Sequence, residues 1–428
     1  MEVSMRKKLL FLFLAFTVFH FAARAQDTIR MMQYNLMYYT NNSGISDCNS
    51  TTNNLNVKDA ALKTIFQYVK PTVLCVNEIG PSMTYVNRIL DNVINTDGVN
   101  YYGHGLLTNY SGGNIANMIY YDTRKLTLCN NYYISTSYRD INGYRFYYNS
   151  AELAQGDTVF MTFWVAHLKA GSGYEEVRRT QVRQLMARIE SMGMPGNYIF
   201  SGDFNMVGAE EPGYQEMVEY ENSLYCFYDP IQQEGHWNNN AQYAACHTQS
   251  THTSSDGCFV TGGLDDRFDL VMVSPYLYYG SMDMQVISGS YHALGQDGHR
   301  FNGSVTSPQN NSVPSNVATA LYQMSDHLPV VVDFKLNATT GIADRENRFL
   351  MSVVNPVRDQ LQVSLQVEEE SVFTFEIYAA NGQLLSSFEQ HLSEGRQQIT
   401  HPFDLPHGIY VLKATNEKHQ QYIQKIVR

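Results

Sequence analysis

Two hydrophobic patterns alternate through the middle of the chain, from about residue 26 to residue 335. The first is a spacing of three or four residues between apolar positions, which predicts amphipathic helices at 57–69, 81–93 and about 174–192. The second is a short, nearly continuous apolar run, which is typical of a strand covered on both faces. Such runs occur at 29–34, 72–76, 159–165, 198–200, 270–273 and 329–334. The alternation predicts an α/β fold, a layered sandwich of two packed mixed sheets flanked by helices.

The last part of the chain follows a different pattern. Runs in which apolar and polar side chains alternate are typical of strands with one buried face, and they occur at 361–367, 373–378 and 408–414. Turn signals separate these runs, at Asn355-Pro356, Asn381-Gly382 and Pro406-His407-Gly408. We therefore expect a small all-β sandwich module over 349–428, after a polar linker over 336–348.

The first 25 residues have the features of a secretory signal peptide. Three basic residues, Arg6, Lys7 and Lys8, precede an apolar run over 9–22, and Ala23-Arg24-Ala25 supplies the small residues of a cleavage site. The mature chain is therefore expected to begin at Gln26. Later apolar runs are too short to cross a membrane, so we expect no stable membrane insertion. The predicted organisation is a signal peptide (1–25), a large central domain (26–335), a linker (336–348) and a C-terminal module (349–428).

Composition and charge narrow the possible partners. The formal net charge is −12 and only 16% of residues are charged. These values argue against a protein that holds nucleic acid by a global basic field, but they leave room for a local cleft. Six cysteines are present, and disulfides are common in exported proteins. Cys246 and Cys258 flank a Ser/Thr-rich loop and are the expected pair, with Cys226 as a competitor, whereas Cys75 lies in an apolar run and should be buried.

Polar side chains stand at the ends of the predicted strands. They are Asn35, Glu78, His167, Asp203 and Asn205 after strands, and Asp269, Asp326 and His327 at the start of strands. Residues just beyond strand ends gather at one rim of a layered α/β fold when strand directions alternate. The carboxylate and amide oxygens suit Mg²⁺, Mn²⁺ or Ca²⁺, while the two histidines supply an acid and a base. This set fits phosphate ester hydrolysis better than acyl transfer, because no Gly-x-Ser-x-Gly motif is present.

Six motifs in order resemble the endonuclease/exonuclease/phosphatase superfamily. They are Met32-Gln33-Tyr34-Asn35, Val76-Asn77-Glu78, Ala166-His167-Leu168-Lys169, Gly202-Asp203-Phe204-Asn205, Arg267-Phe268-Asp269 and Ser325-Asp326-His327-Leu328-Pro329-Val330. The resemblance spans about 29–334, and the superfamily includes deoxyribonuclease I, abasic-site endonucleases, neutral sphingomyelinases and inositol-polyphosphate 5-phosphatases. In this sequence Asn77 stands where Gln often precedes the metal-binding Glu.

The resemblance implies a role for each matching residue. Glu78 would be the principal metal ligand, with Asn35 and Asp326 helping to bind the metal, which would be Mg²⁺ or else Mn²⁺ or Ca²⁺. Asp203 and Asn205 would hold the attacking water and the scissile phosphate. His327, oriented by Asp269, would be the general base, and His167 would donate to the phosphoryl oxygens. Arg139 is matched more loosely to an arginine that contacts the phosphate.

The C-terminal module resembles the sorting domain of the type IX secretion system. The landmarks are Asn355-Pro356, Asn381-Gly382-Gln383, Leu405-Pro406-His407-Gly408-Ile409-Tyr410 and the terminal strand Gln424-Lys425-Ile426-Val427-Arg428. The resemblance implies recognition by the outer-membrane secretion machinery, export across the outer membrane, and then removal of the module with release or attachment at the cell surface. The alternative is a β-sandwich binding module that stays on the enzyme.

Together these features predict a secreted, monomeric, divalent-metal-dependent phosphodiester hydrolase, an extracellular nuclease that cleaves DNA or RNA. A phosphatase or a sphingomyelinase-like lipid phosphodiesterase of the same family is the alternative enzyme, and a catalytically silent surface binding module is the alternative of another class. Two segments, 207–263 and 288–323, have the composition of insertions. Their ring-bearing residues either shape a substrate groove or pack the core of the loops: His236, Trp237, Tyr243, His292 and His299. Arg178 and Arg179 are expected to support helix packing.

Overall fold

The computed structural model describes most of the chain. The described residues are 27–41, 44, 48–150, 153, 158–254, 257–336, 351–354, 356–367, 370–379, 383–417 and 421–428. The predicted signal peptide, the predicted linker apart from residue 336, and the Asn355 and Asn381-Gly382 turn positions lie outside the described residues.

The first sheet of the central domain is mixed. Its strands are β1 (Thr28–Tyr39), β2 (Val73–Ile79), β3 (Tyr102–His104), β4 (Ala116–Asp122), β10 (Met284–Val286), β11 (His292–Ala293) and β12 (Val330–Leu336). They are arranged in the order β10-β12-β1-β2-β4-β3, with β11 pairing with β12. Strand β1 runs parallel to β2 and antiparallel to β12, so the end of β1 lies beside the end of β2 and the start of β12.

The second sheet is also mixed. It follows the order β5-β6-β7-β8-β9, with β5 (Leu126–Ile134), β6 (Ile141–Tyr148), β7 (Phe160–His167), β8 (Asn197–Asp203) and β9 (Asp269–Val273). Strands β7 and β8 are parallel, and β9 is antiparallel to β8. Residue His167 pairs with Asp203, and Asp203 pairs with Asp269 across these strands. The register alone therefore brings three of the predicted site residues side by side.

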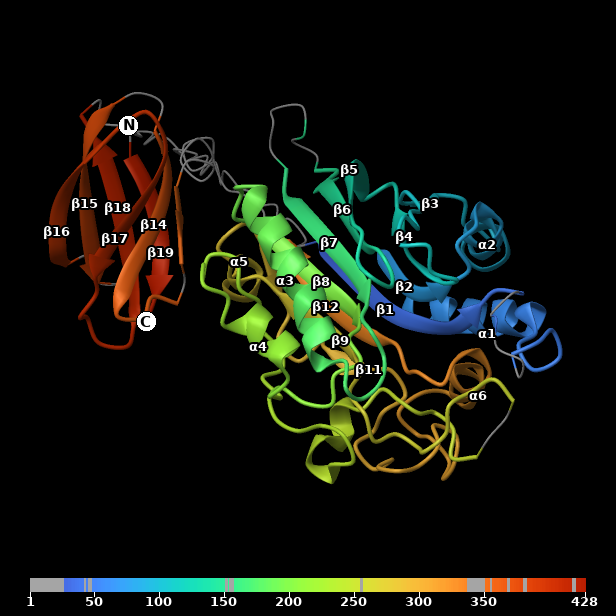
Figure 1. The fold of residues 1–428 in the computed structure, drawn as a ribbon. Coiled ribbons are helices and arrows are strands. Elements are labelled where there is room, and N and C mark those ends of the chain that lie inside the picture. Colours follow the sequence, from blue (N-terminus) through green and yellow to red (C-terminus); the bar gives the residue numbers. More distant parts are fainter. Residues whose placement is uncertain are drawn as a thin grey trace, which may run out of the picture.

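Helices lie on the outer faces of the two sheets and in the connections between strands (Figure 1). They are α1 (Leu55–Val69), α2 (Met83–Ile89), η1 (Leu90–Ile94), α3 (Glu175–Ser191), α4 (Pro212–Val218), η3 (Ala241–Cys246), α5 (Pro275–Tyr279) and α6 (Ser315–Met324). The three helices predicted from the sequence are confirmed, although the second divides into α2 and a π-helical turn, η1. Helix α6 lies inside the segment that was interpreted as an insertion and packs beside α1.

Several strands are buried on both faces, which explains their nearly continuous apolar runs. In β2, Val73 and Cys75 lie in the core between the two sheets, whereas Leu74 and Val76 pack in the core that also contains residues of α1 and α6. Strand β8 does the same, with Ile199 facing inward and Phe200 packing in the core that contains residues of α3 and α4. Both faces of these strands are covered, so neither face needs polar side chains. The predicted layered α/β sandwich is confirmed.

The C-terminal module consists of two antiparallel sheets. Their strands are β13 (Met351–Val353), β14 (Gln360–Val367), β15 (Ser371–Ala379), β16 (Leu384–Leu392), β17 (Gly395–Pro402), β18 (Ile409–Asn416) and β19 (Gln421–Val427). The first sheet is β13-β14-β17 and the second is β16-β15-β18-β19. The two sheets enclose a core of their own, which includes Phe375, Leu412 and Ile426. The predicted small all-β sandwich is therefore confirmed.

Candidate functional site

The ends of several strands meet at one rim of the sandwich. Four strands extend further than the apolar runs predicted, so Asn35, Glu78, His167 and Asp203 lie inside β1, β2, β7 and β8 rather than after them. The β1–β2 pairing shifts register between Asn35 and Tyr39, and Glu78 has a φ of +60°. A side chain in this left-handed region is uncommon, and surrounding contacts must hold the backbone there.

Hydrogen bonds from Asn35 and the β1 backbone hold the first carboxylates. The Asn35 amide donates to Glu78 Oε1 at 3.1 Å and to Asp203 Oδ2 at 2.9 Å, while Asn35 Oδ1 accepts from the Met37 backbone at 2.9 Å. The Tyr38 backbone N–H donates to Glu78 Oε2 at 2.9 Å. Asn35 therefore joins β1 to carboxylates of both sheets, and its oxygen is already engaged by its own strand.

His167 completes a compact set of donor atoms. Its Nε2 lies 3.4 Å from Asp203 Oδ2, and its Nδ1 lies 3.8 Å from Glu78 Oε1 and has no hydrogen-bond partner. One ligand atom from each of Glu78, His167 and Asp203 lies within 4.8 Å of the others. Burial lowers the pKa of His167 well below its usual value, and Arg139 lowers it further. The neutral imidazole can thus act as a ligand or a hydrogen-bond donor.

A second group contains His327 and Asp269. His327 Nδ1 lies 2.6 Å from Asp269 Oδ2, and the Gln249 amide nitrogen lies 2.7 Å from His327 Nε2. Burial by itself would lower the pKa of His327, but the nearby carboxylates of Asp269, Asp326 and Asp203 raise it well above its usual value. The arrangement is that of a histidine oriented by a buried carboxylate, which suits proton transfer at the other ring nitrogen.

Asp326 is held from one side only. Its Oδ2 accepts hydrogen bonds from the Val260 backbone at 3.1 Å and from Gln249 at 3.4 Å, while its buried Oδ1 has no hydrogen-bond partner. Burial raises the pKa of Glu78, and the charge of Asp326 raises it further. Burial also raises the pKa of Asp203 to about 7, with Asp269 and Glu78 adding to the shift. Carboxylates that oppose each other's ionisation in this way are a natural site for a cation.

Arg139 and Asn205 lie beside these groups. Arg139 donates to the carbonyl oxygen of His167 at 3.1 Å and to that of Leu168 at 3.2 Å. Asn205 has a φ of +52°, and its backbone N–H donates to Asp203 Oδ1 at 3.0 Å. The structure thus brings together all nine predicted residues: Asn35, Glu78, Arg139, His167, Asp203, Asn205, Asp269, Asp326 and His327.

Sequence reasoning missed a buried amide network beneath the site. The Asn77 side-chain oxygen accepts from the Gln33 amide at 2.6 Å and from the Asp203 backbone at 3.1 Å. The Asn77 amide donates to Asn117 at 2.7 Å and to the Ala166 carbonyl at 3.0 Å. Asn77 was visible as a departure from the family motif and Gln33 as part of the first motif, whereas Asn117 carried no signal. Gln249, which contacts both Asp326 and His327, also lies outside every motif.

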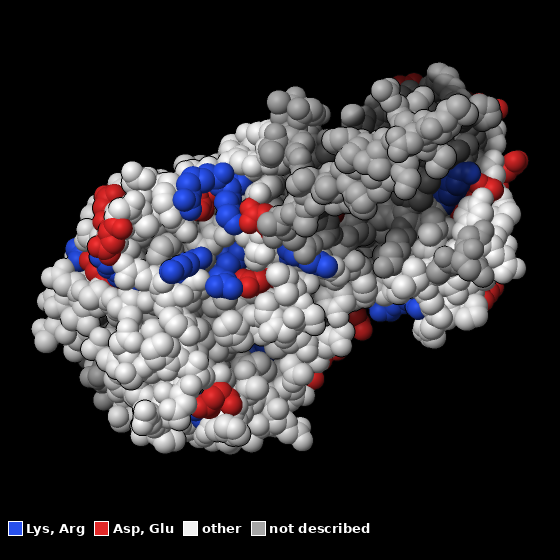
Figure 2. Space-filling model, turned by 180° about the vertical axis from the view of Figure 1, so that it is seen from behind, with Lys and Arg blue, Asp and Glu red and all other residues white. Residues whose placement is uncertain are grey.

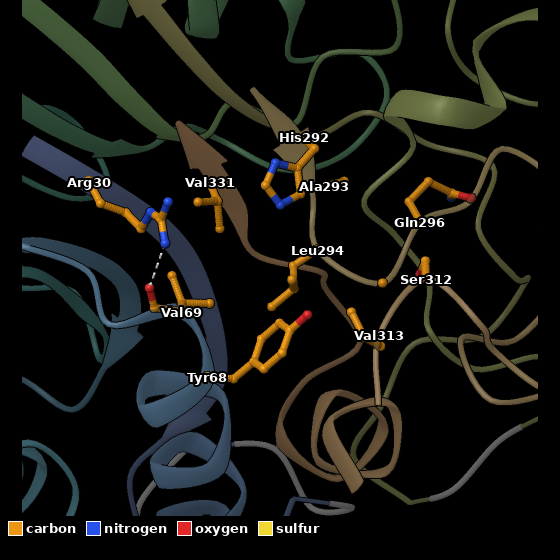
Figure 3. Close-up of a pocket in the computed structure, with 11 residues that line it drawn as sticks. Arg30, Tyr68, Val69, His292, Ala293, Leu294, Gln296, Ser312, Val313 and Val331 are labelled. Carbon is orange, nitrogen blue, oxygen red and sulfur yellow. Dashed lines mark hydrogen bonds between the residues drawn. The ribbon is translucent and has the colours of Figure 1, made fainter. Parts of the chain in front are cut away.

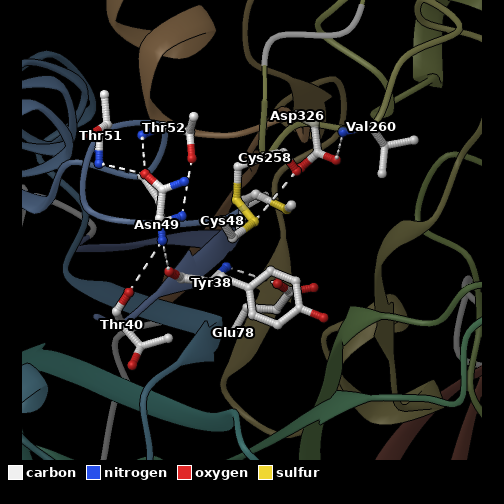
Figure 4. Close-up of a disulfide and its surroundings, with 12 residues drawn as sticks. Tyr38, Thr40, Cys48, Asn49, Thr51, Thr52, Glu78, Cys258, Val260 and Asp326 are labelled. Carbon is white, nitrogen blue, oxygen red and sulfur yellow. Dashed lines mark hydrogen bonds between the residues drawn. A yellow bond between two sulfur atoms is a disulfide. The ribbon is translucent and has the colours of Figure 1, made fainter. Parts of the chain in front are cut away.

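The predicted disulfide partner of Cys258 was wrong. Cys258 is bonded to Cys48, which lies 210 residues earlier in the loop that follows β1 (Figure 4). Cys246 and Cys226 are buried free thiols whose sulfurs contact the nearby carbonyls of Tyr243 and Ser223. Proximity in sequence favoured Cys246, but the fold brings the loop after β1 against the loop around 258. Cys75 is buried, as predicted.

The insertion residue Trp237 packs the interior rather than a groove. Its ring is fully buried, lies edge-on to Tyr214 at 5.5 Å and donates to the Gln233 carbonyl at 2.6 Å. Arg178 is also buried and pairs with Glu211 at 2.8 Å, in agreement with the expected packing role.

A separate pocket lies between the end of α1 and the segment that contains β11 (Figure 3). Arg30, Tyr68 and His292 contribute to its lining, and none of the nine predicted site residues does. The Arg30 guanidinium already makes two hydrogen bonds to Asp333, at 2.7 and 2.8 Å, and a third to the Val69 carbonyl at 3.2 Å. Its charge is therefore neutralised within the protein.

The surface charge is mixed. On the face shown in Figure 2, basic side chains lie beside acidic ones rather than in a continuous stripe. Ion pairs such as Arg179–Glu216 at 3.0 Å and Arg124–Asp122 at 2.6 Å also place a basic side chain next to an acidic one. Such a surface supplies little long-range attraction for a polyanion.

Solved structures similar to the chain include proteins of the predicted superfamily. An endonuclease/exonuclease/phosphatase family protein from Bacteroides thetaiotaomicron is 14% identical, with a TM-score of 0.46 and coverage of 73% of this chain and all of that one. A second, from Beutenbergia cavernae, is 13% identical, with a TM-score of 0.44 and coverage of 94% and 100%. The human Nocturnin catalytic domain with bound sulfate anion is 15% identical, with a TM-score of 0.43 and coverage of 73% and 98%. Comparison with curated proteins found no match.

The C-terminal module is matched by sequence. Residues 355–428 match the family model described as the secretion system C-terminal sorting domain, which indicates export across the outer membrane to a secreted or cell-surface location. Among the helices of the described residues, none has the length and apolarity that a membrane crossing requires. Residues 355–428 therefore form a type IX secretion sorting domain, as predicted, and the solved structures similar to the chain include endonuclease/exonuclease/phosphatase family proteins.

Proposed function

We propose that the protein is a divalent-metal-dependent phosphodiester hydrolase that acts as an extracellular nuclease on DNA or RNA. The observation that carries the proposal is the convergence of buried carboxylates with two histidines at one rim of the sandwich. Glu78, His167 and Asp203 lie within mutual reach of one ion, and the His327–Asp269 pair lies beside them. Neither a purely structural site nor a binding surface needs five buried ionisable groups in contact.

The donor set fits a hard divalent cation. Glu78 is the proposed principal ligand, with Asp203, His167 and Asp326 around it and Asn35 keeping the first two carboxylates in place. The buried Asp326 Oδ1 and His167 Nδ1 both lack a hydrogen-bond partner, so each has a lone pair or a proton to offer. Carboxylate oxygens with one imidazole favour Mg²⁺ or Mn²⁺ over zinc. When bound, the cation would neutralise phosphate oxygens and favour ionisation of an attacking water.

The remaining residues supply proton transfer and orientation. Asp269 holds His327 through Nδ1, and Nε2, which faces the Gln249 amide at 2.7 Å and Asp203 Oδ2 at 3.8 Å, is the nitrogen proposed to exchange a proton with water. Asp203 and Asn205 are the proposed groups that orient that water and the scissile phosphate. Neutral His167, whose carbonyl accepts a hydrogen bond from Arg139, is the proposed donor to a phosphoryl oxygen. Phosphoryl transfer needs mainly positioning and charge stabilisation, so no covalent nucleophile is required.

The test uses the purified protein with plasmid DNA, single-stranded RNA, sphingomyelin and phosphoinositides, each with Mg²⁺, Mn²⁺, Ca²⁺ or EDTA. We expect metal-dependent cleavage of nucleic acid that falls at least about 100-fold in His167→Ala, the usual loss when an acid–base or donor group is removed. Glu78→Gln should weaken Mg²⁺ binding, measured by calorimetry, by at least about tenfold. Glu176→Gln, which changes an exposed carboxylate on α3, is the matched control and should behave as wild type.

Two other outcomes would contradict the nuclease assignment. Turnover of only lipid or monoester substrates would identify a phosphatase or lipid phosphodiesterase. Intact folding without turnover of any substrate would indicate a binding module. In both cases the Mg²⁺ affinity of Glu78→Gln still reports whether the predicted metal site exists.

A further inference from the structure

Four exposed tyrosines lie near the end of β5 and on the segments around residues 110, 138 and 174. Tyr110 exposes 67% of its surface, Tyr133 49%, Tyr138 36% and Tyr174 38%. Large aromatic side chains in a contiguous exposed group mark interaction surfaces more often than chance exposure does. We call these four residues the tyrosine platform.

The rings of the platform are arranged in two pairs. Tyr110 and Tyr133 are stacked, with centroids 4.3 Å apart and an interplanar angle of 29°. Tyr138 and Tyr174 meet edge to face at 6.4 Å, and the Lys169 ammonium lies 5.3 Å from the first ring and 3.9 Å from the second. Flat aromatic faces beside a cation match the two parts of a nucleotide, the base and the phosphate.

Arg139 and Lys169 connect Tyr138 and Tyr174 to the candidate site. Tyr138 precedes Arg139, whose guanidinium donates to the carbonyls of His167 and Leu168. Lys169 follows Leu168 directly, so the cation between Tyr138 and Tyr174 is two residues from His167. A strand with its scissile phosphate at His167 would therefore pass its neighbouring nucleotides over these rings.

Buried polar groups hold the loops that carry the platform. Asp140 accepts hydrogen bonds from Thr108, from the Tyr110 backbone and from Ser111 at 2.6–2.8 Å. Buried Arg178 donates to the carbonyls of Lys169 and Gly171, both at 2.9 Å. Tyr133 stands on β5 and the other tyrosines on segments held by these hydrogen bonds, which reduces the entropy cost of binding.

We propose that the tyrosine platform binds unpaired bases by stacking, so that the enzyme prefers single-stranded nucleic acid to duplex. The proposal rests on the proposed nuclease function and adds the substrate class. Stacking accepts every base but requires that the base faces be free, and in a duplex they are covered by neighbouring pairs. The mixed surface charge agrees with this mode, because stacking supplies affinity that a basic groove would otherwise provide.

The experiment compares three substrates with wild type and with the Tyr138→Ala/Tyr174→Ala protein. They are a labelled single-stranded 20-mer, its duplex, and bis-(p-nitrophenyl) phosphate, a diester without bases. We expect wild type to prefer the single strand, and the double variant to lose at least about tenfold more kcat/KM on the single strand than on the base-free diester. Tyr138→Phe/Tyr174→Phe keeps the rings and should retain the preference. Tyr68→Ala removes an exposed tyrosine on α1 and is the matched control.

Affinity gives a second readout that does not depend on turnover. In a Glu78→Gln background, fluorescence anisotropy of the same single strand should show at least about tenfold weaker binding when Tyr138 and Tyr174 are replaced by alanine. If wild type cleaves nucleic acid but the alanine variant matches it on all substrates, the stacking role of the tyrosine platform is wrong and the nuclease function stands. Equal losses on the base-free diester would show a disturbed catalytic centre and overturn the stacking role. If wild type cleaves no diester, both proposals fail.

Discussion

At the scale of single residues, two buried amides organise the candidate site. Asn35 donates hydrogen bonds to carboxylates from both sheets. Asn77 accepts a hydrogen bond from the Asp203 backbone N–H and donates to Asn117 and to the Ala166 carbonyl. An amide is both donor and acceptor, so one side chain can satisfy groups on either side of the interface between sheets. A carboxylate at position 77 would add another negative charge to a site that already holds several.

Asp140 gives a residue-scale prediction about pH. Burial would raise its pKa, but hydrogen bonds from Ser111, Thr108 and two backbone N–H groups lower it below the usual 3.8. A carboxyl group with a lowered folded pKa stabilises the protein above its unfolded pKa and loses that contribution as the pH falls through the folded pKa. Asp140→Asn should therefore cost about 2 kcal/mol near pH 7 and much less near pH 2.

Urea unfolding of wild type and Asp140→Asn between pH 2 and pH 7 measures this difference. The stability of wild type should fall more steeply below pH 4 than that of the variant. Parallel curves over the whole range would show that Asp140 contributes nothing through its charge.

At the scale of elements, two loops distant in sequence share the support of the site. The loop after β1 contains Cys48, and the loop around Cys258 carries Val260, whose backbone N–H contacts Asp326. Lys58 in α1 also donates to the carbonyls of Leu36 and Met37. Burial lowers the pKa of Lys58 to about 7. The disulfide thus connects the loop whose Val260 N–H binds Asp326 to the loop after Tyr38, whose N–H binds Glu78 (Figure 4).

Cys48→Ser/Cys258→Ser should weaken both the fold and the metal site. A native disulfide that closes a long loop contributes about 2–4 kcal/mol, so thermal unfolding should occur several degrees lower. Mg²⁺ affinity, measured by calorimetry below the unfolding transition, should fall because Val260 no longer holds Asp326. Cys129→Ser removes an exposed free thiol and serves as the control. Unchanged Mg²⁺ affinity in the double variant would show that the disulfide does not support the metal site.

At the scale of the whole molecule, the core of the sorting domain is distinct from the cores of the α/β sandwich. A hydrogen bond from Ser223 to Gln362 at 3.1 Å and the packing of Val354 against the core that contains α3 and α4 connect the two parts. Cooperative unfolding follows shared cores, so parts with separate cores melt independently. This separation suits a module that is recognised during export and then removed. The removal, like the domain boundaries 26–335 and 349–428, stays a prediction.

Calorimetry of the full chain should show two unfolding transitions. Cleavage of the chain near residue 348 and removal of the released module should abolish one transition and leave both the other transition and the Mg²⁺ affinity within experimental error. A single transition, or loss of metal binding after cleavage, would show that the module is an integral part of the enzyme.

The predictions that succeeded concern features that are local in sequence. Helix α3 and strands β1 and β2 follow from the spacing of apolar residues, and Glu78 and Asp203 stand out because polar residues interrupt such runs. Helix α6 was missed because polar residues surround it and its apolar face becomes apparent only against α1. Gln249 was missed because a glutamine in a loop carries no periodicity and no motif.

The sequence by itself determined the layered sandwich, the sorting domain and the identity of the rim residues, because periodicity and ordered motifs are recorded along the chain. Only the tertiary structure decided which groups meet: Cys48 with Cys258, Asn77 with Asp203, and Arg139 with His167. Such contacts join residues far apart in sequence, and their partners depend on how strands pair and loops close over the sheets. The sequence around a single residue therefore does not show which distant residue it will contact.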